Sequence, residues 1–287
     1  MLKKYFLILF PIFLSGQILA DISKPFQAED VFELEYANGP QISPDSQKIV
    51  YERRSNDIMT DSTISNLWLI GSDGNEHRPL VSSMNSSYSA RWSHDGNRIA
   101  YVQSTQNGTG IFVRWMDSGL TGLVSNLRKS PGHLTWSPDG RWLAFVMDVP
   151  KQSDPIAKPR KKPQGAVWAD SVKVIDTARY RWDGRGFLEP SHQHIFVVPA
   201  EGGTPRQVTT GDFNHGGALS WTPDGQKIVF SSNRNHGWEL ESGESDVYMI
   251  NINDGELTQI TSRQGGESNP VVSPNGRMIA YISNPNR

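Results

Sequence analysis

The sequence of 287 residues contains no cysteine. Disulfide bonds, thiolate metal sites, cysteine nucleophiles and a lipid anchor through cysteine are therefore excluded for this chain. An excess of charge of one sign is also missing, because 28 Lys and Arg residues face 30 Asp and Glu residues, for a net charge of −2. No preference for nucleic acid or for an acidic surface follows from this balance.

Long apolar runs are scarce, and the clearest one stands near the N-terminus. Residues 5–14 are apolar and follow two lysines, and a stretch of small and polar residues then ends at Ala20. The run is too short for a comfortable membrane span and has the order of a signal peptide. We predict a signal peptide over residues 1–20 with cleavage after Ala20, a periplasmic or secreted protein, and no membrane contact after its removal. An uncleaved anchor is the alternative.

Catalytic signatures are missing too. The sequence has no G-x-S-x-G nucleophile elbow, no H-E-x-x-H metal motif and no glycine-rich phosphate loop between a strand and a helix. We therefore expect no catalytic residue, no cofactor and no metal site in this chain. His192 and His194 lie two residues apart on an expected strand and share a face. A zinc pair there is an alternative that needs a third ligand.

What the sequence does contain is a repeat. The stretch 136–145 (WSPDGRWLAF) is a tight turn between strands, because Pro138 fixes φ, Asp139 bonds its own backbone and Gly140 takes a positive φ. Related copies begin at Ser43, Ser93, Thr222 and Ser273. Each copy has Ser or Thr first, Asp or Asn third, Ile or Leu seventh and an aromatic residue ninth. This regular place in a hairpin explains the Asp residues better than calcium binding does.

Two further strand-like pieces follow each of the first four repeats, so each unit has four strands. These pieces are residues 67–70 and 79–81, 111–115 and 123–124, 194–198 and 206–209, and 247–250 and 257–261. The middle strands are apolar on both faces, as expected where neighbouring sheets cover both sides. The fold class predicted is all-β: a β-propeller of four-stranded antiparallel blades, with about five repeats present.

The predicted domain boundaries place a lead-in segment at residues 21–40 and a partial propeller at residues 41–287. Residues 28–36 are expected to form a short helix that Gly39-Pro40 ends. The last repeat stops halfway through a blade, so we expect the chain to be a truncated part of a longer protein.

The spacing of the repeats places an insertion at about residues 149–191, between the second and third strands of the third blade. Its first part, residues 151–164, is rich in proline and lysine and is expected to be a mobile loop. Binding of a partner by this charge run is the alternative. Strand character returns at residues 167–168 and 172–188, and an extra blade here is possible although no second turn signature appears.

One segment is more specific than the repeats. Residues 179–187 (RYRWDGRGF) lead into residues 194–198 (HIFVV), residues 202–209 (GGTPRQVT) and residues 221–225 (WTPDG). This succession resembles the prolyl oligopeptidase family of serine peptidases, in particular its acylaminoacyl-peptidase and dipeptidyl-aminopeptidase-like bacterial members. The opening, residues 32–51, is also similar to the start of their propeller. The repeats alone carry less weight, because TolB-like propellers share them.

The resemblance implies that a C-terminal α/β-hydrolase domain with a Ser-Asp-His triad follows the propeller. No residue of this chain matches the triad, so the resemblance assigns it the gating or docking of peptide substrates for that hydrolase domain. The expected partners are therefore the chain's own hydrolase domain and a peptide. Arg179, Arg181 and Trp182 are the candidate contacts, because guanidinium groups suit a carboxylate and Trp suits an apolar side chain. Alternatively, Arg181 and Asp183 pair within a turn and Trp182 packs on a blade.

Two other functions stay open at this point. The chain could be a TolB-like periplasmic interaction module with no enzyme attached. It could also be a propeller fused to a different hydrolase, such as a metal-dependent amidohydrolase, which metal-binding His pairs further along the protein would identify.

Overall fold

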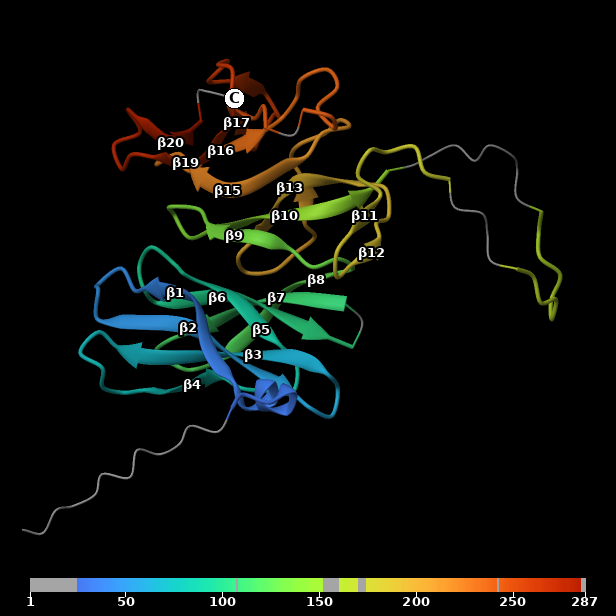
Figure 1. Cartoon of the computed structure of the whole chain (residues 1–287). Helices are drawn as coiled ribbons and strands as arrows, with labels where there is room; N and C mark the ends of the chain where they lie inside the picture. Colours follow the sequence, from blue (N-terminus) through green and yellow to red (C-terminus); the bar gives the residue numbers. More distant parts are fainter. Residues whose placement is uncertain (1–24, 107, 152–159, 170–173, 242, 285–287) are drawn as a thin grey trace, which may run out of the picture.

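The computed structural model describes residues 25–106, 108–151, 160–169, 174–241 and 243–284, and this part of the chain is almost entirely strands. Figure 1 shows the sheets following one another in chain order from the blue end to the red end. The predicted signal peptide and its cleavage point at Ala20 lie outside the described residues. Within them, no helix is both long and apolar enough to cross a bilayer.

Four antiparallel sheets have four strands each and correspond to the first four repeats. Blade 1 consists of β1 (Glu35–Ile42), β2 (Lys48–Asp57), β3 (Ser62–Gly71) and β4 (Arg78–Val81). Blade 2 consists of β5 (Ser87–Trp92), β6 (Arg98–Thr105), β7 (Gly108–Trp115) and β8 (Thr121–Leu127).

Blade 3 consists of β9 (Gly132–Trp136), β10 (Trp142–Pro150), β13 (Ser191–Pro199) and β14 (Arg206–Gln207). Blade 4 consists of β15 (His215–Trp221), β16 (Lys227–Ser232), β17 (Asp246–Asn251) and β18 (Leu257–Gln259). Blade 5 has two described strands, β19 (Glu267–Val272) and β20 (Ile279–Ser283). The predicted architecture of four-stranded blades is confirmed.

The first strands of successive blades contact one another in turn, from β1 through β5, β9 and β15 to β19. These strands therefore lie around a common axis, as in a propeller. The described blades comprise four complete sheets and the two strands of blade 5.

The hydrophobic core lies between blades rather than within one. On β10, Leu143 and Phe145 pack with residues of blade 2, whereas Ala144 and Val146 pack with residues of blade 4. All four side chains are buried. A third cluster, which includes Val50 and Ile99, joins blades 1 and 2 in the same way. The alternation of side chains along a strand thus gives each middle strand two apolar faces.

The repeated turn is held by its first and third residues. The hydroxyl of Ser137 donates to Asp139 Oδ1 at 2.6 Å and accepts the amide of Trp142 at 2.9 Å. Burial raises the pKa of Asp139, but the hydrogen bonds from Ser137 and from the Arg141 backbone and side chain outweigh it and lower that pKa to about 2. Gly140 has φ 66°, the left-handed conformation that the turn requires.

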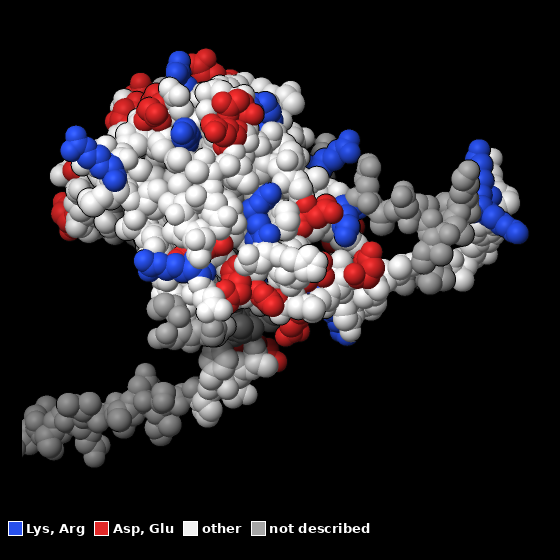
Figure 2. Space-filling view, turned by 90° about the horizontal axis from the view of Figure 1, so that it is seen from above, with Lys and Arg blue, Asp and Glu red and all other residues white. Residues whose placement is uncertain are grey.

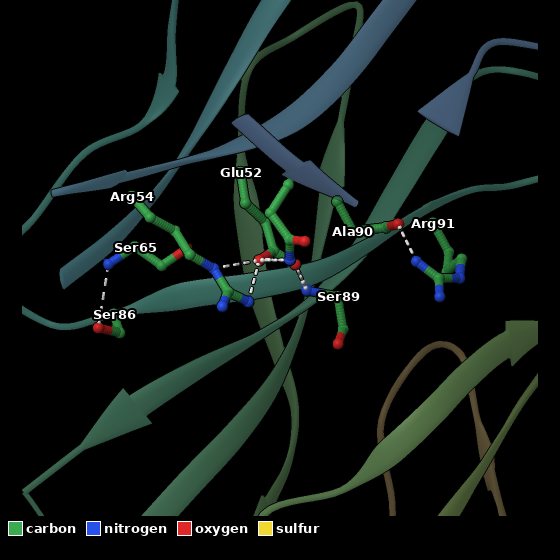
Figure 3. A network of polar contacts seen from close by, with 8 residues as sticks. Glu52, Arg54, Ser65, Ser86, Ser89, Ala90 and Arg91 are labelled. Atoms are coloured by element: carbon green, nitrogen blue, oxygen red, sulfur yellow. Dashed lines mark hydrogen bonds and ion pairs between the residues drawn. The ribbon is translucent and has the colours of Figure 1, made fainter. Parts of the chain in front are cut away.

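A polar network also joins blades 1 and 2. The buried carboxylate of Glu52 accepts hydrogen bonds from the guanidinium of Arg54 at 2.6 Å, from Asn38 Nδ2 at 3.0 Å and from the backbone amide of Ser89 at 2.8 Å (Figure 3). Because Arg54 neutralises the charge and the other donors fill the lone pairs, this buried acid is fully compensated.

The prediction of a helix over residues 28–36 is wrong for its last three residues. A 3-10 helix covers Ala28–Glu33, and β1 then begins at Glu35 because its backbone pairs with β2. Gly39-Pro40 does not end an element. It lies where the register shifts between Asn38 and Gln41, a bulge that accommodates the positive φ of Gly39 and the missing amide proton of Pro40.

The insertion leaves blade 3 between β10 and β13, as predicted, since Pro150 still pairs with Ser191. Its strand character is limited, in the described residues, to the hairpin of β11 (Arg181–Trp182) and β12 (Gly186–Phe187). Residues 167–168 have no strand, because no neighbouring strand is available to pair with them, and no extra blade is seen in the described part of the insertion.

Replacing Ser137 by Ala should destabilise the fold by about 1–3 kcal/mol, because a buried amide loses its acceptor and Asp139 loses a donor. Urea denaturation measures the loss. Ser273 makes the same two bonds in blade 5 but is less buried, so Ser273→Ala is the matched control with a smaller expected loss. Equal losses would show that burial of the turn is unimportant.

Candidate functional site

A cavity of about 1020 Å³ opens where the insertion meets blades 3 and 4. One wall is the β11–β12 hairpin and the segment before it. The opposite wall comes from the ends of β10, β13 and β16 and from the turn that carries Trp238 and Glu239. Figure 1 shows the hairpin beside the end of β10.

The hairpin is stabilised by contacts between residues close together in the sequence. Arg181 pairs with Phe187 and Trp182 with Gly186, and the amide of Leu188 donates to the carbonyl of Tyr180 at 2.9 Å. The rings of Tyr180 and Phe187 lie 6.2 Å apart across the hairpin. Gly184 and Gly186 both have positive φ, which two non-glycine residues would adopt only with strain.

Two of the three predicted contact residues line the cavity. Arg179 and Trp182 do so, and the guanidinium carbon of Arg179 lies 5.1 Å from the centre of the Trp182 ring. Arg181, on the next position of the strand, is not among the lining residues.

The alternative roles of these residues are not what the structure shows. Among the described ion pairs none joins Arg181 to Asp183, whose carboxylate instead accepts the amide of Gly184 at 3.1 Å. Trp182 is 51% exposed and so is not packed into a blade. Its side chain is therefore partly accessible at the wall of the cavity.

Sequence reasoning missed the residues that other segments bring to the cavity. Glu239 accepts the amide of Ala178 at 3.0 Å, which ties the insertion to blade 4. Lys129 donates to Glu189 at 2.7 Å and ties the other end of the insertion to the loop between blades 2 and 3. This partner lowers the pKa of Glu189. Arg185 also lines the cavity, and its place in the RYRWDGRGF segment was the one signal that could have pointed to it.

Three histidines lie at the junction between blades 3 and 4, and one of them, His192, lines the cavity. The rings of His194 and His215 stack at 5.1 Å, and the ring of His192 meets Trp238 edge-on at 5.9 Å. Arg234 donates to His215 Nε2 at 2.6 Å, so the proton of this imidazole lies on Nδ1, which donates to the carbonyl of Gln193 at 3.2 Å.

Burial keeps these histidines neutral. It lowers the pKa of His215 to about 4, with further lowering by His194 and Arg234, and it lowers the pKa of His192 and His194 in the same direction. The zinc alternative for His192 and His194 gains no support, because the described residues hold no cluster of three His, Asp or Glu side chains suited to a metal.

The lining of the cavity offers groups that can bind a ligand. Among the described residues no serine hydroxyl is hydrogen-bonded to a histidine ring, the contact that a serine nucleophile and its base require. The wall of Arg179, Trp182 and Arg185 instead offers two guanidinium groups beside an aromatic face. Such a wall suits a ligand with a carboxylate or carbonyl oxygens and an apolar side chain, which are features of a peptide.

Comparison with known proteins bears on this geometry. The family model of the dipeptidyl peptidase IV N-terminal region matches residues 161–286, which include the hairpin and blades 4 and 5. Dipeptidyl-peptidase 5 of Porphyromonas gingivalis is 26% identical over 260 residues, which cover 84% of this chain and 36% of that protein. The sequence is similar to the propeller part of prolyl oligopeptidase family peptidases. The resemblance drawn from the RYRWDGRGF segment is thereby confirmed.

One solved structure shows the same fold, and the sequence is also similar to TolB proteins. The chain superposes on a solved acylaminoacyl peptidase in complex with Z-Gly-Gly-Phe-chloromethyl ketone with a TM-score of 0.58 and 15% identity, over 80% of this chain and 33% of that one. The Tol-Pal system protein TolB of Francisella tularensis is 24% identical over 245 residues, 82% of this chain and 54% of that protein. The chain spans about a third of the length of the curated peptidases it matches.

Because these histidines are neutral in the folded chain, the free energy of unfolding should decrease as the pH is lowered. In the unfolded chain an imidazole takes up a proton as the pH falls below about 6.5, whereas His215 stays neutral until about 4. Its contribution is therefore present above pH 6.5 and is lost as the pH falls toward 4, on the order of 3 kcal/mol. Denaturation curves measured between pH 7 and 4.5 check this slope.

The variant His215→Asn should reduce the slope, because Asn does not titrate. His236, an exposed residue of blade 4, provides the control His236→Asn, in which the slope should persist. An unchanged slope in His215→Asn would contradict the assignment.

Proposed function

We propose that this chain is the substrate-gating or docking portion of an exported serine peptidase, acting for a C-terminal α/β-hydrolase domain. The observation that carries the proposal is the cavity beside the insertion, into which Arg179 and Trp182 face from one wall. Hydrolysis itself would follow nucleophilic acyl transfer in the hydrolase domain. The propeller would contribute recognition of the peptide.

The charges around the cavity support recognition of a peptide rather than of a polyanion. Arg179 and Arg185 are balanced there by acidic side chains such as Asp148 and Glu239. Figure 2 likewise shows Lys and Arg beside Asp and Glu on one face of the molecule, with no broad surface of one sign. A peptide offers isolated charges and backbone carbonyls, which fit such a mixed lining.

Export is part of the proposal. The order of lysines, apolar run and small residues up to Ala20 supports a signal peptide and a periplasmic or secreted location. The expected partners are a peptide and the chain's own hydrolase domain.

A second candidate is a TolB-like interaction propeller without an enzyme. The similarity to TolB over 245 residues favours it. The reading frame beyond Arg287 separates the two candidates, because the peptidase requires further blades followed by a G-x-S-x-G segment on a strand-turn-helix.

The variant Trp182→Ala should weaken peptide turnover by the protein that includes the hydrolase domain. We expect kcat/KM to fall about 10-fold or more, since an aromatic contact with a bound side chain is worth roughly 1–2 kcal/mol. Arg179→Ala should act in the same direction. Kinetics with a series of short peptides measures both.

Arg181→Ala is the matched control, because Arg181 lies on the same hairpin but does not line the cavity. It removes a charge of the same kind and should leave kcat/KM within about 2-fold. Equal losses in Arg179→Ala and Arg181→Ala would contradict a role for the cavity.

The isolated chain should have no peptidase activity, because the triad is expected in the hydrolase domain. Incubation of purified residues 21–287 with aminoacyl chromogenic substrates tests this. Measurable cleavage that survives removal of trace proteases would refute the division of roles between propeller and hydrolase.

A further inference from the structure

Two positions recur at the junctions between blades, and the residue types at these positions differ from one junction to the next. One position is on the third strand of a blade, where its residue pairs with the residue ten places after the start of the repeat. The other is at the start of the next blade's first strand. The pairs are Asn66 and Ser87 between blades 1 and 2, His194 and His215 between blades 3 and 4, and Asp246 and Glu267 between blades 4 and 5.

The pairs between blades 1 and 2 and between blades 3 and 4 consist of neutral groups. Asn66 accepts the amide of Ser83 at 3.0 Å, and Ser87 accepts from Gln103 at 3.0 Å. His194 and His215 stack as neutral rings. The junction between blades 4 and 5 differs, because both of its side chains are acids.

These two acids are buried, and only one of their four carboxylate oxygens, Asp246 Oδ2, accepts a hydrogen bond among the described residues. Glu267 is 0% exposed and Asp246 6% exposed. In the described part of the chain, three of their carboxylate oxygens have no hydrogen-bond partner: both oxygens of Glu267, and Oδ1 of Asp246. Desolvation, and after it the charge of Glu267, raise the pKa of Asp246. Burial and the nearby charge of Glu267 therefore both disfavour the ionised form of Asp246.

Two hydrogen bonds between Ser245 of blade 4 and Glu267 of blade 5 hold the two acids at this junction. The amide of Glu267 donates to the carbonyl of Ser245 at 2.7 Å, and the hydroxyl of Ser245 donates to the carbonyl of Glu267 at 2.8 Å. Asp246 follows Ser245 directly at the start of β17. The acids cannot separate without breaking this contact between blades.

The chain shows elsewhere how it neutralises a buried acid. Glu52, also buried, has Arg54 and backbone and amide donors around its carboxylate (Figure 3). No Lys or Arg among the described residues forms an ion pair with Asp246 or Glu267. Burying two ionised carboxylates without a cation destabilises the fold, so we expect a positive charge to bind at this junction.

The side chains that act on Asp246 include those of Gln259, Thr261 and Glu244, all of which carry oxygen atoms. Thr261 Oγ1 accepts the amide of Val247 at 2.8 Å, and Glu244 accepts the amide of Gly265 at 2.9 Å. Gln259 donates to Asp246 Oδ2 at 3.0 Å. The available ligands are carboxylate, hydroxyl and carbonyl oxygens, the set that hard divalent cations prefer, and Ca²⁺ in particular accepts irregular oxygen shells.

We propose that Asp246 and Glu267 bind a calcium ion that joins blades 4 and 5. The described residues offer no third His, Asp or Glu in metal-binding geometry, so the remaining ligands are hydroxyl and carbonyl oxygens and water. Ser245, the residue before Asp246, also lines the cavity of the proposed function, but calcium binding at this junction does not rest on that function.

Thermal unfolding of the purified chain tests the proposal. At pH 7.5, millimolar CaCl2 should raise Tm by about 5 °C relative to NaCl at matched ionic strength, because an ion that binds only the folded state stabilises it by mass action. MgCl2 should have a smaller effect, since Mg²⁺ demands a regular octahedral shell. Calorimetric titration with CaCl2 should show binding to one site.

Asp246→Asn and Glu267→Gln should abolish both the Tm response and the binding. Each variant should also be more stable than the parent without calcium, because it removes charge repulsion while keeping the shape of the side chain. Glu256→Gln removes an exposed carboxylate from the same blade and should keep the full response. Far-UV circular dichroism checks that the variants remain folded.

Two results would overturn the proposal. One is a calcium response that persists in both variants. The other is a parent chain that ignores calcium but gains stability as the pH falls from 7.5 to 5.5, since a proton shared by the two carboxylates would then balance the pair.

Discussion

Packing between blades is the constraint on which this structure depends. The middle strands have apolar side chains on both faces, so Leu143 and Phe145 need blade 2 while Ala144 and Val146 need blade 4. One sheet cannot cover its own faces, and a stable arrangement therefore requires sheets in succession. The first strands of the blades come together around a common axis as a consequence.

This constraint leaves the edges of the blades free to vary. The insertion lies between the end of β10 and the start of β13, so it leaves the pairing of residues Trp142 to Pro150 with β13 undisturbed. The cavity forms at that edge because Lys129 and Glu239 tie the insertion to neighbouring segments. The polar pairs at the junctions vary for the same reason, since the apolar clusters already hold the blades together.

The parts that sequence reasoning predicted are those set by local chemistry. The Ser-Pro-Asp-Gly turn and its strands were predicted because three neighbouring residues decide the turn. The helix expected up to Tyr36 failed, since pairing of β1 with β2 outweighs an apolar period of a few residues. Arg179 and Trp182 were identified, but Trp238 and Glu239 were not, because they reach the cavity from another blade.

By itself the sequence determined the repeat, the number of strands in each unit, the place of the insertion and the resemblance to peptidase propellers, because each is written in residues close together in the chain. Only the tertiary structure decided that Arg179 and Trp182 line the cavity while Arg181 does not, and that Asp246 and Glu267 are both buried at one junction between blades. The physical reason is that stacking joins residues from separate blades, and burial then sets which charges must be balanced.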